Sequence, residues 1–438
     1  MIRRASASRA DTDGTGTRGV GWAAGLRRVA HPALPGLAVL FAFASPADAA
    51  EYFVRPTISA GLDYDDNRRL DPVNPKTVTT QRYFPALLFG VRTPAVNTRG
   101  IARAEIIQAD DDELDRTNGF MRLNTTYTTP RDLWDADVEW RQDSTLSTSI
   151  VDPSNVDPGV DVDDPPTDTD FDVRGRVRQE VQRTKVRFRP TLTHVLTPKL
   201  NLELGYRFSS TTFEDVPGTD LEDSTVNKVL GELAYQLTPI DTLIGRLDYA
   251  HFDSDASVFD QGSVLGGLGH SFSETFDAEL LLGATYTTFE DEATAESPQG
   301  DSGDDTTFAV YLTVEKELRT GSVTAFFQRD VGGGGFGSAR RSTQLDVLWD
   351  TIIVPDRWFF SLAGEAFRTD AIDEEDSGDD RSYLQIVPKL RWQFSRQLAL
   401  DISYRYRVND PEGPDNTADS NAGIIGLVFT FDQYAISR

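Results

Sequence analysis

Apolar and polar residues alternate with a period of two along much of the chain after residue 50. In the first such stretch the even positions are mostly apolar and the odd ones mostly polar: Val54, Pro56, Ile58, Ala60, Leu62 and Tyr64 against Arg55, Thr57, Ser59, Gly61 and Asp63. The same alternation returns at 200–209 and 398–407. A period of two is that of a β-strand with one apolar and one polar face, and the 3.6-residue spacing of a helix is absent from these windows.

Short and long connections alternate between the predicted strands. The short ones are 94–100, 129–132, 197–199, 238–241, 273–275, 318–321, 355–357 and 395–397. The long, acidic ones are 65–79, 110–117, 149–172, 214–225, 253–260, 290–306, 330–341, 369–381 and 408–420. Together these connections predict eighteen strands. The sequence TTFED, at 211–215 and again at 287–291, then ends the seventh and the eleventh strand, two hairpins apart.

The asymmetry of the connections distinguishes between two classes of β protein. Soluble sandwiches and propellers also alternate, but their strands are usually about five or six residues long. A bilayer-spanning strand needs about 9 to 11 residues. Tryptophans fall near predicted strand ends, where an outer-membrane barrel carries aromatic girdles; the alternative is that they are ordinary core residues. They are Trp134, Trp140, Trp349, Trp358 and Trp392. We therefore predict an all-β, transmembrane antiparallel up-and-down β-barrel of about eighteen strands, with short periplasmic turns and long acidic extracellular loops.

The N-terminal segment has the features of an export signal. Arg27 and Arg28 precede an apolar run that ends in the small-x-small motif Ala47-Asp48-Ala49. The run is too short to span a bilayer as a helix. We predict a secretory signal peptide at 1–49, with Ala47 and Ala49 as the small residues of its cleavage motif, followed by a barrel at 50–438. An N-terminal membrane anchor is the alternative.

The C-terminal stretch "NAGIIGLVFTFDQYAISR" carries Gly426, Phe429 and Phe431. This spacing resembles the assembly signal of barrels in Gram-negative outer membranes, although that signal more often ends at its aromatic residue, and here seven residues follow Phe431. With the opening strand "SAGLDYDDN" and the Leu-Thr-Pro turns, the chain from residue 50 resembles the β-barrel porin families of proteobacteria, particularly those associated with exopolysaccharide systems. The resemblance implies the outer membrane, contact with the lipid bilayer and lipopolysaccharide, insertion by the barrel assembly machinery, and polysaccharide export components as further partners.

Composition and motifs exclude several function classes. The chain has 43 Lys and Arg against 70 Asp and Glu, a net charge of −27, and no cysteine. Such a charge disfavours nucleic acid as a partner. His270 adjoins Ser271, but neighbours in a strand point to opposite faces, so they cannot form a nucleophile–base pair. The motifs G-x-S-x-G, H-E-x-x-H and GxxxxGK[ST] are absent. We expect no enzymatic activity, no cofactor and no metal site.

The polar faces of the predicted strands mix both signs of charge. The candidate lumen-lining residues are Glu139, Arg141, Arg187, Arg189, Glu203, Arg207, Arg246, Asp248, Glu279, Lys389, Arg391, Arg405 and Arg407. A water-filled channel requires a polar lumen, and a barrel of 16 to 18 strands is wide enough to hold one. The alternative is a packed, purely structural lining of salt bridges. Basic residues also change parity between Arg178 and Arg183, which predicts either a β-bulge there or a strand that leaves the membrane and bends.

The long connections concentrate carboxylates. Residues 149–172 hold eight Asp and no Lys or Arg. Carboxylates at this density can collect Ca²⁺ or Mg²⁺, but 168–172 lacks the Gly and the distal Glu of a calcium loop, so solvated loops are the alternative. We expect 149–172 to fold inward, narrow the pore and repel anions.

Three hypotheses for function follow. The first is a porin-like outer-membrane channel that passes small hydrophilic solutes. The second is the outer-membrane exit of an exopolysaccharide export system. The third is a structural or adhesive surface barrel.

Overall fold

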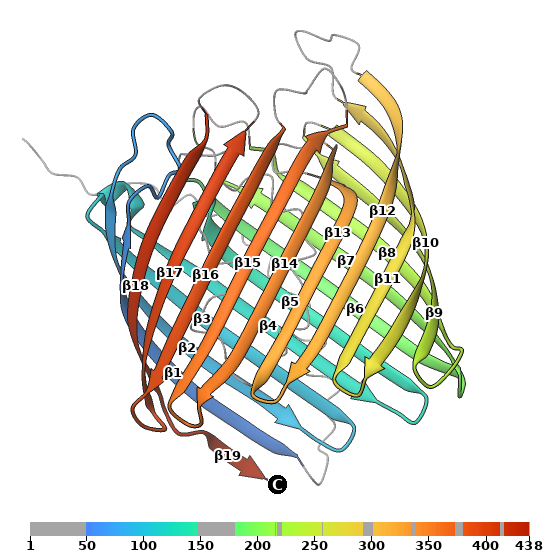
Figure 1. The fold of residues 1–438 in the computed structure, drawn as a ribbon, viewed down its shortest axis with the longest axis horizontal. Coiled ribbons are helices and arrows are strands. Elements are labelled where there is room, and N and C mark those ends of the chain that lie inside the picture. Colours follow the sequence, from blue (N-terminus) through green and yellow to red (C-terminus); the bar gives the residue numbers. More distant parts are fainter. Residues whose placement is uncertain are drawn as a thin grey trace, which may run out of the picture. The chain divides into compact units, whose positions relative to one another are not determined.

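The structure is a computed structural model that describes residues 50–146, 180–214, 216, 221–255, 257–291, 301–333, 339–372, 380–411 and 416–437. These residues form one antiparallel sheet (Figure 1). The strands are β1 (Glu51–Asp65), β2 (Val78–Arg92), β3 (Val96–Ala109), β4 (Arg116–Thr128), β5 (Asp132–Ser144), β6 (Gln182–Thr197), β7 (Leu200–Phe213), β8 (Ser224–Gln236), β9 (Asp241–Ser254), β10 (Ser257–Ser273), β11 (Phe276–Asp291), β12 (Asp301–Leu318), β13 (Gly321–Gly333), β14 (Ala339–Val354), β15 (Trp358–Ala371), β16 (Arg381–Gln393), β17 (Leu398–Pro411), β18 (Ala418–Thr430) and β19 (Tyr434–Ser437). A single 3-10 turn, η1 (Asp112–Leu114), is the one helical element of the described residues.

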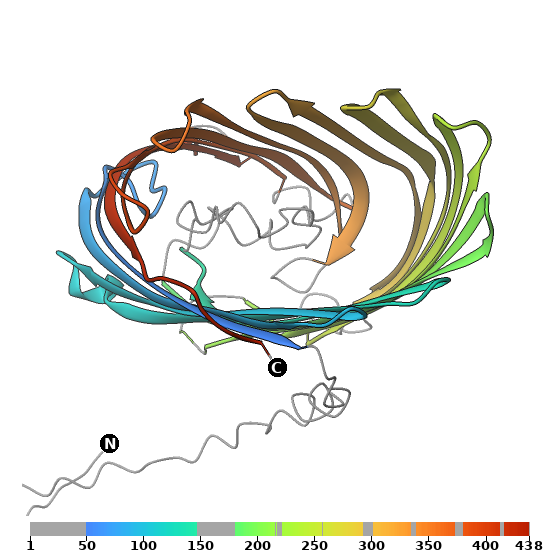
Figure 2. The same ribbon diagram turned by 90° about the horizontal axis from the view of Figure 1, so that it is seen from below.

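The sheet closes on itself between its first and last long strands. β1 pairs with β2 along one edge and with β18 along the other, from Thr57 opposite Thr430 to Asp65 opposite Ala422. Figure 2 shows the resulting ring of strands end-on. Closure leaves no unpaired edge in the bilayer, where a free backbone N–H or C=O group costs several kcal/mol. The predicted fold class, a closed antiparallel barrel of eighteen long strands, is confirmed for the described residues.

The residues after Phe431 continue the seam. Residues 434–437 form β19, which pairs with the start of β1 from Val54 opposite Tyr434 to Glu51 opposite Ser437. The additional C-terminal residues therefore extend the β1 ladder beyond the end of β18. All four β19 side chains are exposed.

The two copies of TTFED lie where the strand count places them. Thr211, Thr212 and Phe213 end β7, and 287–291 end β11. Phe213 lies opposite Arg183, and Thr287 lies opposite Asp305. The repeat is thus separated by four strands, which confirms the strand count from which it was interpreted.

Several strands run further than the sequence predicts. The loop predicted at 253–260 is wrong, because β9 reaches Ser254 and β10 begins at Ser257. The loop at 290–306 is also shorter, since β11 and β12 pair as far as Asp291 and Asp301. The turn at 94–100 contains only Thr93 to Ala95 between paired strands. Polar residues on paired strands beyond the bilayer have the composition of a loop, so composition alone misplaces these ends.

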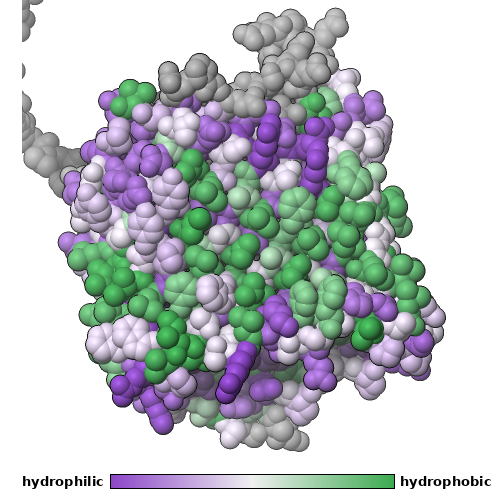
Figure 3. Space-filling model, viewed as in Figure 1, coloured by the Kyte–Doolittle hydropathy of each residue, from purple (hydrophilic) through white to green (hydrophobic). Residues whose placement is uncertain are grey.

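The outer face carries an apolar band. In the middle of the strands, outward side chains are aliphatic and exposed: Ile58, Leu62, Leu204, Leu247, Val264, Leu282, Ile402, Ile425 and Leu427. Figure 3 shows apolar residues gathered across the middle of one face. Exposed aliphatic groups in such number would be unfavourable in water, so the band is the surface that contacts lipid chains. Within the described residues, no helix is both long and apolar enough to cross a membrane.

Aromatic residues flank this band. On the side of the short turns, Trp358 stacks on Trp392 with ring centroids 5.2 Å apart, and Trp392 packs against Phe394 at 4.2 Å. Toward the long connections, tyrosines donate hydrogen bonds to outward polar groups, as Tyr206 does to Asn227 at 2.7 Å. Trp134, Trp349 and Trp392 are exposed and so are not core residues. Rings with one polar end suit the lipid–water interface.

Three predictions fall outside the described residues. They are the signal peptide at 1–49 with its cleavage motif, the acidic segment 149–172, and the basic residues at 174–178. Within the described part, β6 pairs with β5 from Gln182 to His194 without a register shift.

Candidate functional site in the barrel lumen

Charged residues lie on the inward face because strand geometry separates them from the apolar face. On β9, Leu247 is 60% exposed on the outside, so its neighbours Arg246 and Asp248 point inward. The same alternation places all the candidate lining residues on the face opposite the apolar band. They are Glu139, Arg141, Arg187, Arg189, Glu203, Arg207, Arg246, Asp248, Glu279, Lys389, Arg391, Arg405 and Arg407.

Ion pairs join neighbouring strands across β4, β5 and β6. Asp137 on β5 accepts hydrogen bonds from Arg122 on β4 at 2.6 Å and from Arg189 on β6 at 3.0 Å. Glu139 lies 3.1 Å from Arg141 and 3.7 Å from Arg187. Each carboxylate therefore holds two guanidinium groups, which fixes these long side chains against the wall.

Two further groups of ion pairs lie on other parts of the wall. Arg246 contacts Glu232 at 2.7 Å and Glu279 at 3.9 Å. Lys228 lies 2.5 Å from Asp248. On β16 and β17, Asp401 holds Arg391 at 2.7 Å and Lys389 at 3.1 Å. Positive and negative side chains thus alternate over short distances along the inward face of the wall.

The first long connection, residues 66–77, folds against the inward face. Leu70 is buried in a cluster with Phe367, Tyr383 and Ala418, which belong to β15, β16 and β18. Its φ of 50° is rare for a residue with a side chain and is maintained by this packing. The side chain of Asn67 donates hydrogen bonds to the carbonyls of Asp71 and Asp419, both at 3.0 Å. The segment 66–77 is therefore held against the inward face, and we call it the inward loop.

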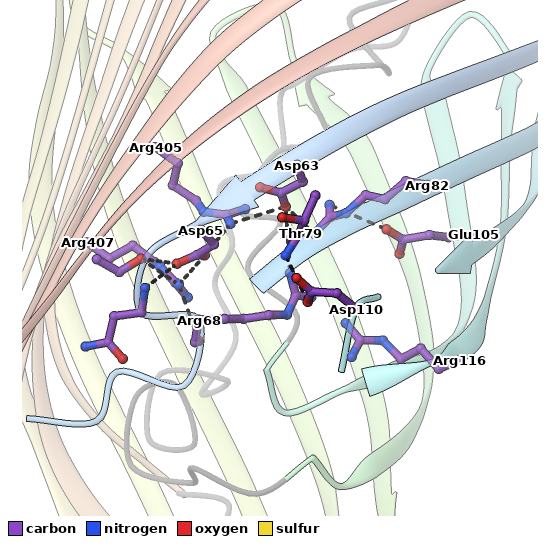
Figure 4. Close-up of polar contacts among 12 residues, drawn as sticks. Asp63, Asp65, Arg68, Thr79, Arg82, Glu105, Asp110, Arg116, Arg405 and Arg407 are labelled. Carbon is purple, nitrogen blue, oxygen red and sulfur yellow. Dashed lines mark hydrogen bonds and ion pairs between the residues drawn. The ribbon is translucent and has the colours of Figure 1, made fainter. Parts of the chain in front are cut away.

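The base of the inward loop meets a cluster of charges (Figure 4). We call it the arginine cluster: Asp63, Asp65, Arg68, Arg82, Glu105, Arg405 and Arg407. Asp63 is shared by Arg82 at 2.8 Å, Arg405 at 3.5 Å and Arg68 at 3.7 Å. Asp65 holds Arg405 at 2.9 Å and Arg407 at 2.8 Å. Arg82 also lies 3.6 Å from Glu105. Apart from Arg82 and Glu105, these residues are almost wholly buried.

A cavity of about 770 Å³ lies on the side of the short turns, against the inward faces of β1 to β8. Its cationic lining residues are Arg55, Arg92, Arg99, Arg122, Arg189, Arg207 and Lys228, and its acidic ones are Glu51, Asp135, Asp137 and Glu203. Cationic groups outnumber acidic ones here, although the whole chain carries −27. Three of the predicted lining residues, Arg189, Glu203 and Arg207, meet in this cavity.

The arginine cluster brings together residues that sequence reasoning treated separately or missed. Arg405 and Arg407 are among the predicted lining residues, and Asp63 lies on the predicted polar face of β1. Asp65 and Arg68 fall in a segment predicted to be a loop, and no local pattern distinguishes them from other loop charges. Sequence reasoning also missed the inward fold of 66–77. It assigned the inward fold to the longest connection, 149–172, which lies outside the described residues.

Histidines pair with aspartates near the strand ends. His194 lies 2.6 Å from Asp132, and His270 lies 2.7 Å from Asp241. The hydroxyl of Ser271 instead bonds Asp277. His270 and Ser271 therefore have separate partners on opposite faces of β10. Among the described residues, no group of three His, Asp or Glu side chains is placed to hold a metal ion.

The comparisons with known proteins are as follows. No protein-family model and no curated protein sequence matches the chain. Among solved structures it is similar to OccAB4 of Acinetobacter baumannii, at 12% identity, with 89% of this chain and 100% of that chain covered and a TM-score of 0.44. It is similar to OccK5 (OpdH) of Pseudomonas aeruginosa, at 13% identity, with 87% and 98% covered and a TM-score of 0.40. It is also similar to the outer membrane protein opdK of Pseudomonas aeruginosa, at 11% identity, with 87% and 99% covered and a TM-score of 0.41.

Proposed function

We propose that the protein is an outer-membrane channel that passes small hydrophilic solutes. The observation that carries the proposal is the lumenal cavity of about 770 Å³ with its lining of charged residues. A closed barrel of this strand number encloses more volume than its inward side chains fill. A polar wall keeps water in that volume, which is what diffusion of hydrophilic solutes needs.

The arrangement of the ion pairs supports an open path in this part of the lumen. Asp137 holds Arg122 and Arg189 flat against the wall of neighbouring strands, so these long side chains do not extend across the cavity. Because these side chains are already ordered by their ion pairs with Asp137, the passage of a solute costs them little additional conformational entropy. The inward loop does not line this cavity, because its Leu70 packs on β15, β16 and β18.

The test is conductance of the protein purified from membranes of a Gram-negative expression host. In planar bilayers in potassium chloride, we expect stepwise insertion of open channels. Two variants carry the same added side chain on opposite faces. Asn124→Trp places an indole in the cavity and should lower the single-channel conductance, whereas Leu247→Trp on the lipid face should leave it unchanged.

The other two hypotheses are outcomes of the same experiment. Folded protein that inserts but shows no conductance would reject the diffusion channel. A closed barrel would then favour an export exit opened by partners, or a structural barrel. Equal conductance in the Asn124→Trp and Leu247→Trp variants would place the current outside this cavity.

A further inference from the structure

Arg68 is buried in a way that leaves its charge poorly compensated. Its side chain is 1% exposed, and none of its three guanidinium nitrogens donates a hydrogen bond to a described residue. Its one ion pair within the described part of the chain is to Asp63, at 3.7 Å. Buried polar groups are nearly always hydrogen-bonded, and an unsatisfied one costs about 1–3 kcal/mol, or more when charged. A guanidinium group in this position therefore needs an acceptor.

The two aspartates of the arginine cluster already contact other arginines. Of the three contacts of Asp63 with arginines, the one with Arg82 is the shortest, at 2.8 Å, and Asp65 lies between Arg405 and Arg407. The arginine cluster holds four arginines and three carboxylates, and Glu105 is engaged by Arg82 at 3.6 Å and by Asn118 at 2.8 Å. Nearby Arg116 is paired with Glu180. The unmatched positive charge falls on Arg68, since its contact with a carboxylate is the longest in the cluster.

Positively charged neighbours add to the cost of burying the charge of Arg68. Burial, together with the neighbouring guanidinium groups of Arg82 and Arg116, lowers the pKa of Arg68 to about 9. The group still carries its proton at neutral pH. Figure 4 shows its side chain extending from the inward loop between Asp63 and Arg116. A negatively charged group beside Arg68 would relieve both the desolvation and the like-charge repulsion.

We propose that Arg68 and the neighbouring arginines form a binding subsite for the oxyanionic group of a small anionic solute. A guanidinium group presents donors in a planar fork that matches the two oxygens of a carboxylate or phosphate. This inference rests on the proposed channel function and names the class of solute, namely anions bearing a carboxylate or a phosphate.

The position of the cluster fits a step on a path through the lumen. Asp63 and Arg55 lie on the same inward face of β1, and Arg55 lines the cavity on the side of the short turns. Cationic residues outnumber acidic ones in that cavity as well. An anion leaving the arginine cluster would therefore meet positive potential along this face of β1.

The experiment measures block of the chloride current by inorganic phosphate and, in a separate arm, by acetate. We expect saturable block in the wild-type channel. Arg68→Met should weaken this block about tenfold or more, which is the effect of losing one charge-assisted hydrogen bond. Arg68→Lys keeps the charge but loses the fork, so it should weaken the block less. Arg69→Met is the matched control, because Arg69 bonds the exposed Glu113 at 2.9 Å outside the cluster.

The outcomes are distinct. Block by phosphate alone, or by acetate alone, identifies the oxyanion that the subsite takes. Equal block in wild type, Arg68→Met and Arg69→Met overturns the inference, as does a conducting wild-type channel that neither anion blocks. If the folded protein does not conduct, the proposed function fails by itself. Calorimetric titration of the detergent-solubilised protein with phosphate and acetate then tests the subsite. A heat of binding that is present in wild type and Arg69→Met but reduced in the Arg68 variants supports it. Absence of binding heat in wild type overturns it. If Arg68→Met does not fold, Arg68→Lys decides between these outcomes.

Discussion

Arg407 donates a hydrogen bond from its guanidinium group to the backbone carbonyl oxygen of Arg68, across 3.3 Å. The same nitrogen lies 2.8 Å from Asp65 and 2.9 Å from the hydroxyl of Ser420. One side chain of β17 thus holds the inward loop, the end of β1 and the start of β18 together. Arg407 therefore connects the inward loop to the seam at which the barrel closes.

Replacing Arg407 by Met should destabilise the barrel and loosen the inward loop. Removing one partner from a buried ion pair costs roughly 3–5 kcal/mol, because the remaining charge stays buried. Urea-induced unfolding in lipid vesicles measures this loss, and single-channel conductance should rise as the loop moves. Arg368→Met is the control, since Arg368 pairs with Asp370 on an exposed site where a pair contributes about 0–1 kcal/mol. Similar losses for the two variants would contradict the role given to Arg407.

Leu70 tests whether apolar packing holds the inward loop in place. Leu70→Ala removes contacts with Phe367 and Tyr383 and should lower the free energy of unfolding by about 2–5 kcal/mol. It should also raise the open-channel noise, because the loop loses its anchor. Val73 lies in the same loop but is 74% exposed, so Val73→Ala should change stability by no more than about 0.5 kcal/mol. An unchanged Leu70→Ala variant would show that the hydrogen bonds of Asn67 hold the loop by themselves.

The orientation of the barrel can be read from epitope insertion. An epitope placed between β11 and β12, at 292–300, should bind antibody on intact cells. One placed in the turn Thr238–Asp241 should bind only after the outer membrane is permeabilised, because short turns of such barrels face the periplasm. Antibody binding at both sites on intact cells would refute this orientation.

The two faces of the wall should respond differently to charge. Leu247→Arg sets a cation in the apolar band and should cost roughly 2–4 kcal/mol near the bilayer midplane. Asn124→Arg adds the same side chain to the cavity, where Asp135 is within reach, and should be nearly neutral. Refolding titrations in lipid measure both. Equal costs would mean that Leu247 does not face lipid.

Asp111 links the first two long connections, and its contribution should depend on pH. A hydrogen bond from Lys76, with the charges of Lys76 and Arg69, lowers the pKa of Asp111 below its usual value. Its stabilising effect is therefore complete above the unfolded pKa of about 3.9 and is lost as the pH falls through the lower folded pKa. Asp111→Asn should be less stable than wild type at pH 7 and equal to it at strongly acidic pH. A difference that persists in acid would assign the effect to packing.

The alternation of residues and the lengths of the connections are sufficient to predict the architecture of the wall. In a strand, successive side chains point to opposite faces, so the identities of Leu247, Arg246 and Asp248 already decide which of them meets lipid. Connection lengths likewise give the number of strands, because an antiparallel hairpin pairs residues that are close in the chain. These properties are local in the sequence, and for this reason the strand count and the inward placement of the charged residues can be predicted without the tertiary structure.

Which charges meet on the inward face depends on the tertiary structure. Whether Arg405 meets Asp65 depends on closure of the sheet between β1 and β18, which joins residues from opposite ends of the chain. The inward fold of 66–77 depends on the cluster of Leu70 with β15, β16 and β18, and composition marks that segment only as an acidic loop. A net charge of −27 describes the whole chain, whereas the potential in the lumen depends on the few charges that closure gathers there. Closure brings Arg405 and Arg407 to Asp63 and Asp65, because the pairing of β1 with β18 places the two ends of the chain side by side.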